Sequence, residues 1–230
     1  MAPREVIEVT PGVFVATSRL YQTSSTLVTK DGMALLVDPA WTPDELVGLA
    51  ETIADLDLTI TAGYSTHAHY DHLLWHARYG APPRWATRRS VELAHERREH
   101  LATQLGEPLA AAVGDTFARV SPLPGDHVPE PYGATGPDEP IEVIVHDAHC
   151  QGHGALWFPE RRLLLAADML SDFELPLPFD PDDLPAYLTG LERLAPYVAR
   201  ASHLITGHGS PTDRPMERLD ADRHLLDGLL

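Results

Sequence analysis

The sequence predicts an α/β fold with the four layers of an αββα sandwich. Short apolar runs bounded by Gly, Pro and Asp alternate with amphipathic segments in the strand, helix, strand order that such a sandwich needs. A cluster of three histidines and one aspartate lies within residues 66–72, directly after a predicted strand, where a loop at the sheet edge would hold it. At 230 residues the chain is expected to form one domain, residues 1–230.

The first part of the chain is predicted to contain three strands, a helix and a fourth strand. Residues 13–15, 26–28 and 34–37 are short β-branched or apolar runs with turn residues between them, so we expect successive antiparallel strands. Thr42 then offers an N-cap before Pro43, and apolar residues at helical spacing continue to Leu56. A strand at about residues 58–64 leads into the histidine cluster.

The elements after the cluster are less regular. Residues 106–140 are rich in proline and glycine, which exclude a long helix; this insertion is expected either to cover the histidine cluster or to be an ordinary surface segment. The other predicted elements are a short helix at 73–79, a strand at 84–87, a polar helix at 90–105, strands at 141–145, 156–158, 163–165 and 202–206, a helix that begins near 183, and a last helix at about 216–229.

The stretch Thr66-His67-Ala68-His69-Tyr70-Asp71-His72 has the residue types and the crowding of metal ligands. His67 and His69 alternate, so at the end of an extended segment both side chains project to one side and can chelate a single ion. Asp71 and His72 follow directly, and a turn there would direct them to a point beside that ion. The local pattern therefore predicts two metal ions.

This stretch resembles the His-x-His-x-Asp-His signature of the metallo-β-lactamase superfamily. Three later stretches resemble the family's remaining segments in the same order: His149-Cys150-Gln151-Gly152-His153, Ala166-Ala167-Asp168-Met169 and Thr206-Gly207-His208-Gly209. The resemblance runs from about Val13 to about Gly209, and it departs from the family at Ala167, where glycine is more common, and at residues 73–75, which are bulkier. It implies a four-layer αββα metallo-β-lactamase sandwich with the metal site at one edge of the two sheets.

The resemblance also implies a role for each ligand. His67, His69 and His149 would bind one ion, Asp71, His72 and His208 would bind a second, and Asp168 would bridge the two. Two divalent ions are thus expected as cofactors; nitrogen and oxygen ligands favour Zn²⁺ and also accept iron or manganese. His153 is expected to form a hydrogen bond that orients a ligand, because such outer partners usually accompany metal-bound imidazoles and carboxylates.

Composition restricts the partners. The 17 basic and 34 acidic residues give a formal net charge of −17, which repels phosphate backbones and anionic lipids, so neither nucleic acid nor a membrane surface is expected as a partner. The single cysteine, Cys150, excludes an intrachain disulfide and is expected to be a small buried residue. With no apolar core of a signal peptide at the N-terminus, we expect a cytoplasmic location. The sequence leaves open whether the chain forms a homo-oligomer.

Hydrolysis is the chemistry expected of two bridged ions, which make hydroxide available at neutral pH. Asp71 would accept the proton of the attacking water and pass it on, and Tyr70 or Tyr187 would donate to the developing oxyanion. Resemblance to the family's lactonases and glyoxalase-II-like thioesterases implies a small-molecule substrate with an ester, lactone or thioester bond. The substrate would have an apolar part if the loop at residues 170–181 lines the cleft.

Three alternatives stay open. A mononuclear non-haem iron oxygenase, like the persulfide dioxygenases of the family, would use two histidines and one aspartate on one iron; the presence of Asp71, His72 and His208 argues against it. Another hydrolase of this fold would act on a phosphoester or a β-lactam. A binding protein that keeps its metals without turnover is the third.

Overall fold

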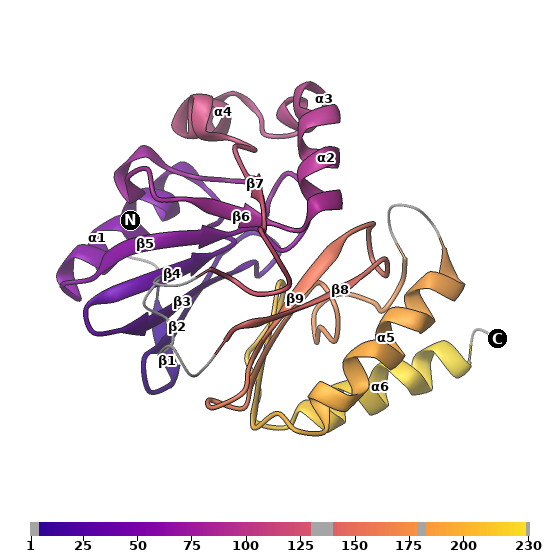
Figure 1. Ribbon diagram of the computed structural model, residues 1–230. Coiled ribbons are helices and arrows are strands. Elements are labelled where there is room, and N and C mark those ends of the chain that lie inside the picture. The colour runs from indigo at the N-terminus through magenta and orange to yellow at the C-terminus, as the bar shows by residue number, and fades with distance from the viewer. Residues whose placement is uncertain (1–4, 130–139, 179–182, 229–230) are drawn as a thin grey trace.

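The strands form two mixed sheets that pack against one another in the centre of the molecule (Figure 1). The computed structural model describes residues 5–129, 140–178 and 183–228. Within these residues the larger sheet has the order β1-β2-β3-β4-β5-β6-β7, and the smaller sheet has the order β11-β10-β9-β8. The strands are β1 (Val6–Thr10), β2 (Val13–Thr17), β3 (Ser24–Lys30), β4 (Met33–Val37), β5 (Thr59–Tyr64), β6 (Arg84–Ala86), β7 (Ser121–Pro122), β8 (Glu142–His146), β9 (His153–Phe158), β10 (Leu163–Ala167) and β11 (His203–Thr206).

Helices cover the outer face of each sheet. The larger sheet packs against α1 (Pro43–Asp55), α2 (Arg88–Glu96), α3 (Arg98–Thr103) and α4 (Glu107–Val113), and the smaller against α5 (Leu184–Val198) and α6 (Pro215–Asp227) (Figure 1). This order of layers confirms the predicted α/β fold and its αββα sandwich. Among the described residues, none of the helices combines the length and the apolar character needed to span a bilayer.

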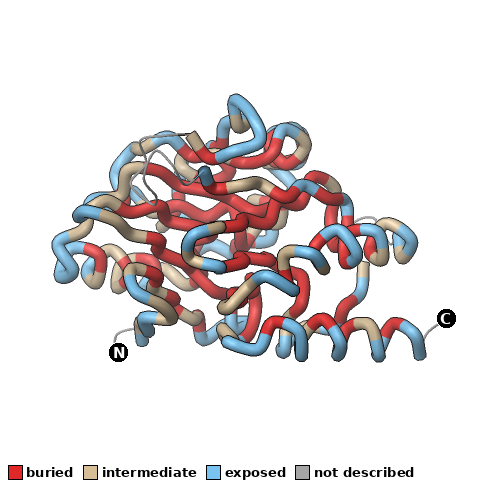
Figure 2. The backbone as a smooth tube through the Cα atoms, turned by 60° about the horizontal axis from the view of Figure 1, so that its bottom comes forward, coloured by how far each residue is buried: buried red, intermediate tan, exposed pale blue. Residues whose placement is uncertain are grey.

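Side chains that alternate along the strands divide the core into three apolar layers. In β4, Leu36 packs toward the helices α1 to α4, while Leu35 faces the smaller sheet. In β10, Leu165 faces the larger sheet and Leu164 packs against α5 and α6. Because both faces of these strands are buried, they are continuous apolar runs in the sequence. Figure 2 shows that the buried backbone follows the strands and that exposed positions lie on the outer helices.

The predicted helix at residues 73–79 is wrong. Only Ala77–Tyr79 is helical, as a short 3₁₀ turn. The guanidinium of Arg84 donates hydrogen bonds to the carbonyl oxygens of Leu73 and Leu74, at 3.2 and 3.4 Å, and the backbone N–H of Ala118 also donates to Leu73. Carbonyls that a helix would use internally are therefore occupied by partners from elsewhere in the chain.

The segment from residue 88 to residue 123 also differs from the prediction. The expected helix at 90–105 is interrupted at Arg97, and Arg98 after the break donates to the carbonyl oxygens of Asp115 and Phe117. The described start of the proline- and glycine-rich insertion forms α4 and β7, and its apolar residues belong to the core beneath the helices. This part belongs to the helix layer and to the edge of the larger sheet, and none of its described residues is among the clustered donors. Residues 130–139 of the insertion lie outside the described residues.

A buried carboxyl group on α6 makes folding sensitive to pH. Asp222 is 4% exposed, and its Oδ2 has no hydrogen-bond partner among the described residues. Burial raises its pKa to about 7, although the backbone N–H of Leu170 and the charge of Arg218 act in the opposite direction. Because this pKa exceeds the ordinary value of 3.8, the protonated group favours the folded state; its contribution is complete below about pH 4 and is lost as pH rises through 7.

Asp222→Asn is therefore expected to stabilise the protein above pH 7. The amide keeps an acceptor for the N–H of Leu170 and removes the buried charge. We expect a Tm increase of about 2–4 °C at about pH 8, equivalent to about 1 kcal/mol, and no increase at about pH 4. Thermal unfolding at both pH values measures this difference. An equal Tm change at the two pH values would mean that the Asp222 charge is not the cause.

Candidate metal centre

One edge of the sandwich collects the residues that the sequence singles out. β5 ends directly before the stretch that carries His67 to His72, β8 leads into the turn that holds His149, β10 ends before Asp168, and β11 ends before His208. β4 runs parallel to β5 and β10 runs parallel to β11, so the carboxyl ends of each pair lie at the same edge of their sheet. Residues far apart in the sequence thus meet between the two sheets.

The first group of donor atoms contains His67, His69, His149 and Asp168. The distance from Nδ1 of His69 is 3.0 Å to Nε2 of His67 and 3.1 Å to Nε2 of His149. Oδ2 of Asp168 lies 3.3 Å from Nε2 of His67 and 3.2 Å from Nε2 of His149. All four donors lie within 4.8 Å of one another, as one cation requires.

The second group contains Asp71, His72 and His208. Oδ2 of Asp71 lies 3.5 Å from Nε2 of His72 and 3.4 Å from Nε2 of His208, and the two imidazole nitrogens are 3.4 Å apart. Oδ1 of Asp168 lies 3.3 Å from Nε2 of His72. Oδ2 of Asp168, which contacts the first group, also lies 3.5 Å from Nε2 of His208. The Asp168 carboxylate therefore contacts both groups, which is the arrangement expected of a bridging ligand.

The spacing and chemistry of these donors fit a divalent metal. Two ligands of a tetrahedral zinc, each bonded at about 2.05 Å, lie roughly 3.3 Å apart, and the nitrogen pairs above are close to this distance. The Asp168 carboxylate is buried and lies among histidine nitrogens at 3.2 to 3.5 Å. A buried carboxylate oxygen in this state has a large cost unless a cation compensates it. The cluster is therefore a His/Asp metal-binding site.

Asp38, at the end of β4, holds the cluster in place and was not identified from the sequence. Its Oδ2 lies 2.9 Å from Nδ1 of His72 and accepts a 2.6 Å hydrogen bond from the hydroxyl of Thr66, while Oδ1 accepts from the Thr66 N–H at 2.9 Å. An acceptor on Nδ1 leaves Nε2 of His72 as the ligand atom and fixes the ring orientation. The feature of the sequence that could have indicated this role is the position of Asp38, an acid directly after the buried strand β4, which runs parallel to β5.

Backbone carbonyls and cross-sheet hydrogen bonds complete this support. Nδ1 of His208 lies 2.8 Å from the carbonyl oxygen of Tyr21, which again leaves Nε2 for a metal. On the other sheet, the N–H of Gly154 donates to the Thr66 carbonyl at 2.8 Å, and the Tyr64 hydroxyl donates to the Gly154 carbonyl at 3.2 Å. The start of β9 is thereby joined to the strand end that carries the histidines.

The backbone is left-handed where β4 and β10 enter the site, with φ +46° at Asp38 and +48° at Ala167. L-residues other than glycine adopt this region at a cost. At residue 167 the resembled family more often has glycine, and the left-handed φ supplies a physical reason for that preference. Both positions adjoin the cluster, because Asp38 contacts His72 and Ala167 directly precedes Asp168.

The two groups differ in protonation. Burial lowers the pKa of His67 well below its usual value and that of His69 to about 4, so both imidazoles are neutral at pH 7 with a lone pair for a metal. Burial alone would also lower the pKa of His72 and His208, but the carboxylates of Asp168 and Asp71 outweigh it; they raise that of His208 to about 11. A cation entering the second group would displace protons from these two rings.

His153 contacts the cluster in a different way from the one predicted. Its ring stacks on His67, with centroids 5.0 Å apart and an interplanar angle of 23°, and on His146 at 4.5 Å and 25°. Neither ring nitrogen of His153 has a hydrogen-bond partner among the described residues. The expected hydrogen bond to a ligand is therefore wrong, and His153 supports His67 by packing. Cys150 is buried, as expected.

The two tyrosines proposed as oxyanion donors lie in different surroundings. Tyr70 is half-buried beside Trp41, with ring centroids 5.1 Å apart, and burial followed by the charge of Asp71 raises its pKa to about 12. Its hydroxyl is protonated at neutral pH and available as a donor. Tyr187 lies on the buried face of α5 and is 1% exposed, as a structural tyrosine would be.

Apolar side chains and one carboxylate surround the second group. Tyr21 and Phe173 are 58% and 46% exposed, and both lie on segments bonded to the His208 loop: Gly209 donates to the carbonyl of Gln22, and Ser171 donates to the carbonyl of His208. Glu174 follows on the same segment as Phe173. Leu175 and Leu177 continue it as exposed residues.

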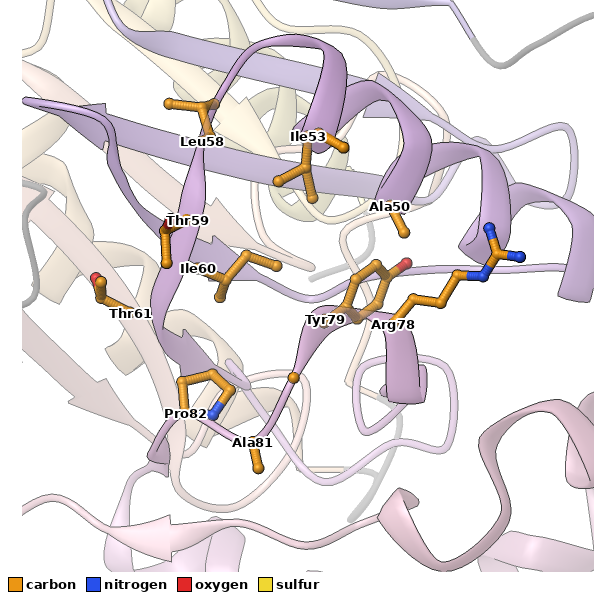
Figure 3. Close-up of a pocket in the computed structure, with 12 residues that line it drawn as sticks. Ala50, Ile53, Leu58, Thr59, Ile60, Thr61, Arg78, Tyr79, Ala81 and Pro82 are labelled. Carbon is orange, nitrogen blue, oxygen red and sulfur yellow. The ribbon is translucent and has the colours of Figure 1, made fainter.

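A separate hollow of about 550 Å³ lies on the helix side of the larger sheet, between α1, the start of β5 and the turn at residues 77–82 (Figure 3). Ile53, Ile60 and Tyr79 line it, and none of the candidate ligands does. β5 begins at this hollow and reaches the histidine stretch at its other end, so the hollow is not part of the metal-binding cluster.

Three solved structures share this arrangement of layers. A metallo-beta-lactamase from Pontibacter korlensis has a TM-score of 0.72 at 19% identity, covering 97% of this chain and 99% of that one. A metallo-beta-lactamase family protein from Thermus thermophilus has 0.70 at 21%, covering 96% and 81%. A beta-lactamase domain protein from Burkholderia ambifaria has 0.70 at 20%, covering 99% and 76%. At these identities the similarity shows the fold alone. The comparison with curated proteins gives no match.

The family itself is shown by sequence. The model of the metallo-beta-lactamase superfamily matches residues 18–210, which include all four segments that contribute to the His/Asp cluster. The match extends over most of the chain. The protein belongs to the metallo-beta-lactamase superfamily and has the fold of its metal-dependent hydrolases.

Proposed function

We propose that this protein is a dinuclear metal-dependent hydrolase that cleaves an ester, lactone or thioester bond in a small substrate with an apolar part. The observation that carries the proposal is the second donor group, because Asp71, His72 and His208 converge beside the first group and the Asp168 carboxylate contacts both groups. A mononuclear iron oxygenase with two histidines and one aspartate would have no use for a second group.

The chain's residues fit the steps of hydrolysis. Two divalent ions, Zn²⁺ by preference and iron or manganese as alternatives, would be held by the seven ligands and would supply hydroxide by lowering the pKa of a water from 15.7 to about 7. Asp71 accepts the proton of the attacking water and transfers it to the leaving group. Tyr70 donates its hydroxyl proton in a hydrogen bond to the oxygen that becomes negative.

The surroundings favour a neutral, partly apolar substrate. Exposed Tyr21 and Phe173 flank the His208 loop and offer apolar contact to a bound molecule. Among the described residues, the ion-pair partners of Asp71 and Asp168 are histidines, with no arginine or lysine. Phosphoester substrates usually need such cations, so carbonyl substrates are the better match.

The test is metal content combined with a substrate panel. Protein purified without a chelating tag is expected to contain two divalent ions per chain and to hydrolyse at least one lactone, thioester or aryl ester, and EDTA is expected to abolish turnover. His208→Gln should lower both metal content and rate. One iron per chain with oxygen consumption in the presence of a persulfide would refute the proposal, as would hydrolysis confined to β-lactams or phosphoesters.

A further inference from the structure

Glu174 is an acidic residue beside the cluster that neither the family signature nor the proposed mechanism uses. It lies six residues after Asp168, on the segment that follows β10. One of its carboxylate oxygens lies within 4.8 Å of a carboxylate oxygen of Asp168 and of a ring nitrogen of His208. The donor atoms of the two groups described above lie within the same 4.8 Å of one another.

The segment around Glu174 is fixed to the His208 loop. The Ser171 hydroxyl donates to the carbonyl oxygen of His208 at 2.8 Å and accepts from the N–H groups of Phe173 and Glu174, each at 2.9 Å. Asp172 accepts from the Ser210 N–H at 2.8 Å. The position of Glu174 relative to His208 is therefore determined by several bonds.

The Glu174 carboxylate has no compensating partner in the described part of the chain. It is half-buried, and no hydrogen bond or ion pair to its oxygens is found there. Two carboxylates that face each other and a histidine at this distance gain stability when a cation lies between them.

We propose that Glu174 is a further ligand of the second metal ion, an inference that rests on the proposed dinuclear centre. This ion would then have two imidazoles, His72 and His208, and three carboxylates, Asp71, Asp168 and Glu174. The first ion would keep three imidazoles and one carboxylate. Carboxylates suit Mn²⁺ and similar hard ions, whereas imidazoles suit Zn²⁺, so the two sites differ in metal preference.

The experiment is a titration of chelator-treated protein with Mn²⁺ and with Zn²⁺, followed by calorimetry and metal analysis. The variants are Glu174→Gln, Glu174→Ala and, as a control with the same change of charge, Glu217→Gln, whose side chain is 63% exposed and paired with Arg214. Circular dichroism verifies that every variant is folded. His208→Gln marks the loss of the second site.

We expect both Glu174 variants to weaken the Kd of the second Mn²⁺ by about tenfold or more and to leave the first within about twofold. Their preference for Mn²⁺ over Zn²⁺ at the second site should also fall, and Glu217→Gln should match the wild type. An unchanged second Kd would overturn the assignment, and so would equal weakening of both sites, which a through-space charge would produce. A wild-type chain that binds only one ion would refute the dinuclear centre itself and the Glu174 ligand with it.

Discussion

Asp168→Asn is expected to lower kcat by about 10³-fold or more, a loss of about 4 kcal/mol of transition-state stabilisation. The Asp168 carboxylate contacts both donor groups: Oδ2 lies within 3.3 Å of His67 and His149 and 3.5 Å from His208, and Oδ1 lies 3.3 Å from His72. An amide retains one oxygen, carries no charge and presents an NH₂ group to part of the donor cluster. The variant should therefore lose the ability to hold both ions at once.

Metal analysis and steady-state kinetics on the same sample measure this effect. The matched control is Asp213→Asn, because the Asp213 side chain is 80% exposed and lies outside the cluster, and it should retain both metal content and rate. Asparagine at 168 with two ions per chain and a rate within tenfold of the wild type would show that Asp168 does not bridge them. Loss of metal without loss of rate would refute the metal-dependent mechanism.

The layers and the cluster were predictable because both depend on local patterns. Strands buried on both faces are mainly apolar runs of four to six residues in this chain, as in β4, β9, β10 and β11, and turn residues separate many of them. His67 to His72 are nearly contiguous, so their convergence needs only a strand end and a turn. His149, Asp168 and His208 were found through the resemblance to the family, and the structure brings them to the same edge.

Contacts between distant segments explain what was missed. Asp38 is an isolated acid after β4, with no other candidate ligand next to it in the sequence. It contacts His72 because β4 and β5 are parallel neighbours in this register. The apolar residues Leu73 to Trp75 are compatible with a helix, but Arg84 binds the carbonyls of Leu73 and Leu74. Glu174 lies in a loop whose apolar residues alternate as in a strand while its prolines argue against one, and this pattern does not indicate a ligand. The approach of Glu174 to His208 depends on the Ser171 bonds.

Gly207→Ala is expected to disrupt the centre although it adds only one methyl group. A Cβ at Gly207 would collide with Oδ1 of Asp168 and would lie 3.1 Å from Cε1 of His72 and 3.1 Å from the backbone carbon of Ala167. Gly207 N–H donates to the Ala167 carbonyl at 2.6 Å, so the backbone has little room to retreat. The methyl group must displace Asp168, which faces both donor groups.

The expected result is a loss of about 1–3 kcal/mol of stability from overpacking and a decrease in metal affinity that removes most activity. Gly48→Ala is the matched control, because nothing lies within 4 Å of a Cβ at this position in α1; there the same substitution should stabilise the helix by about 1 kcal/mol. Thermal unfolding with and without added metal, together with metal analysis, separates the two effects.

If Gly207→Ala had the Tm and the metal content of the wild type, Asp168 would have another position available, and its role as the fixed bridge between both groups would be untenable. If Gly207→Ala lowers the free energy of unfolding and Gly48→Ala raises it, the loss is caused by contact with Asp168, because the entropy of the unfolded chain changes similarly in both variants.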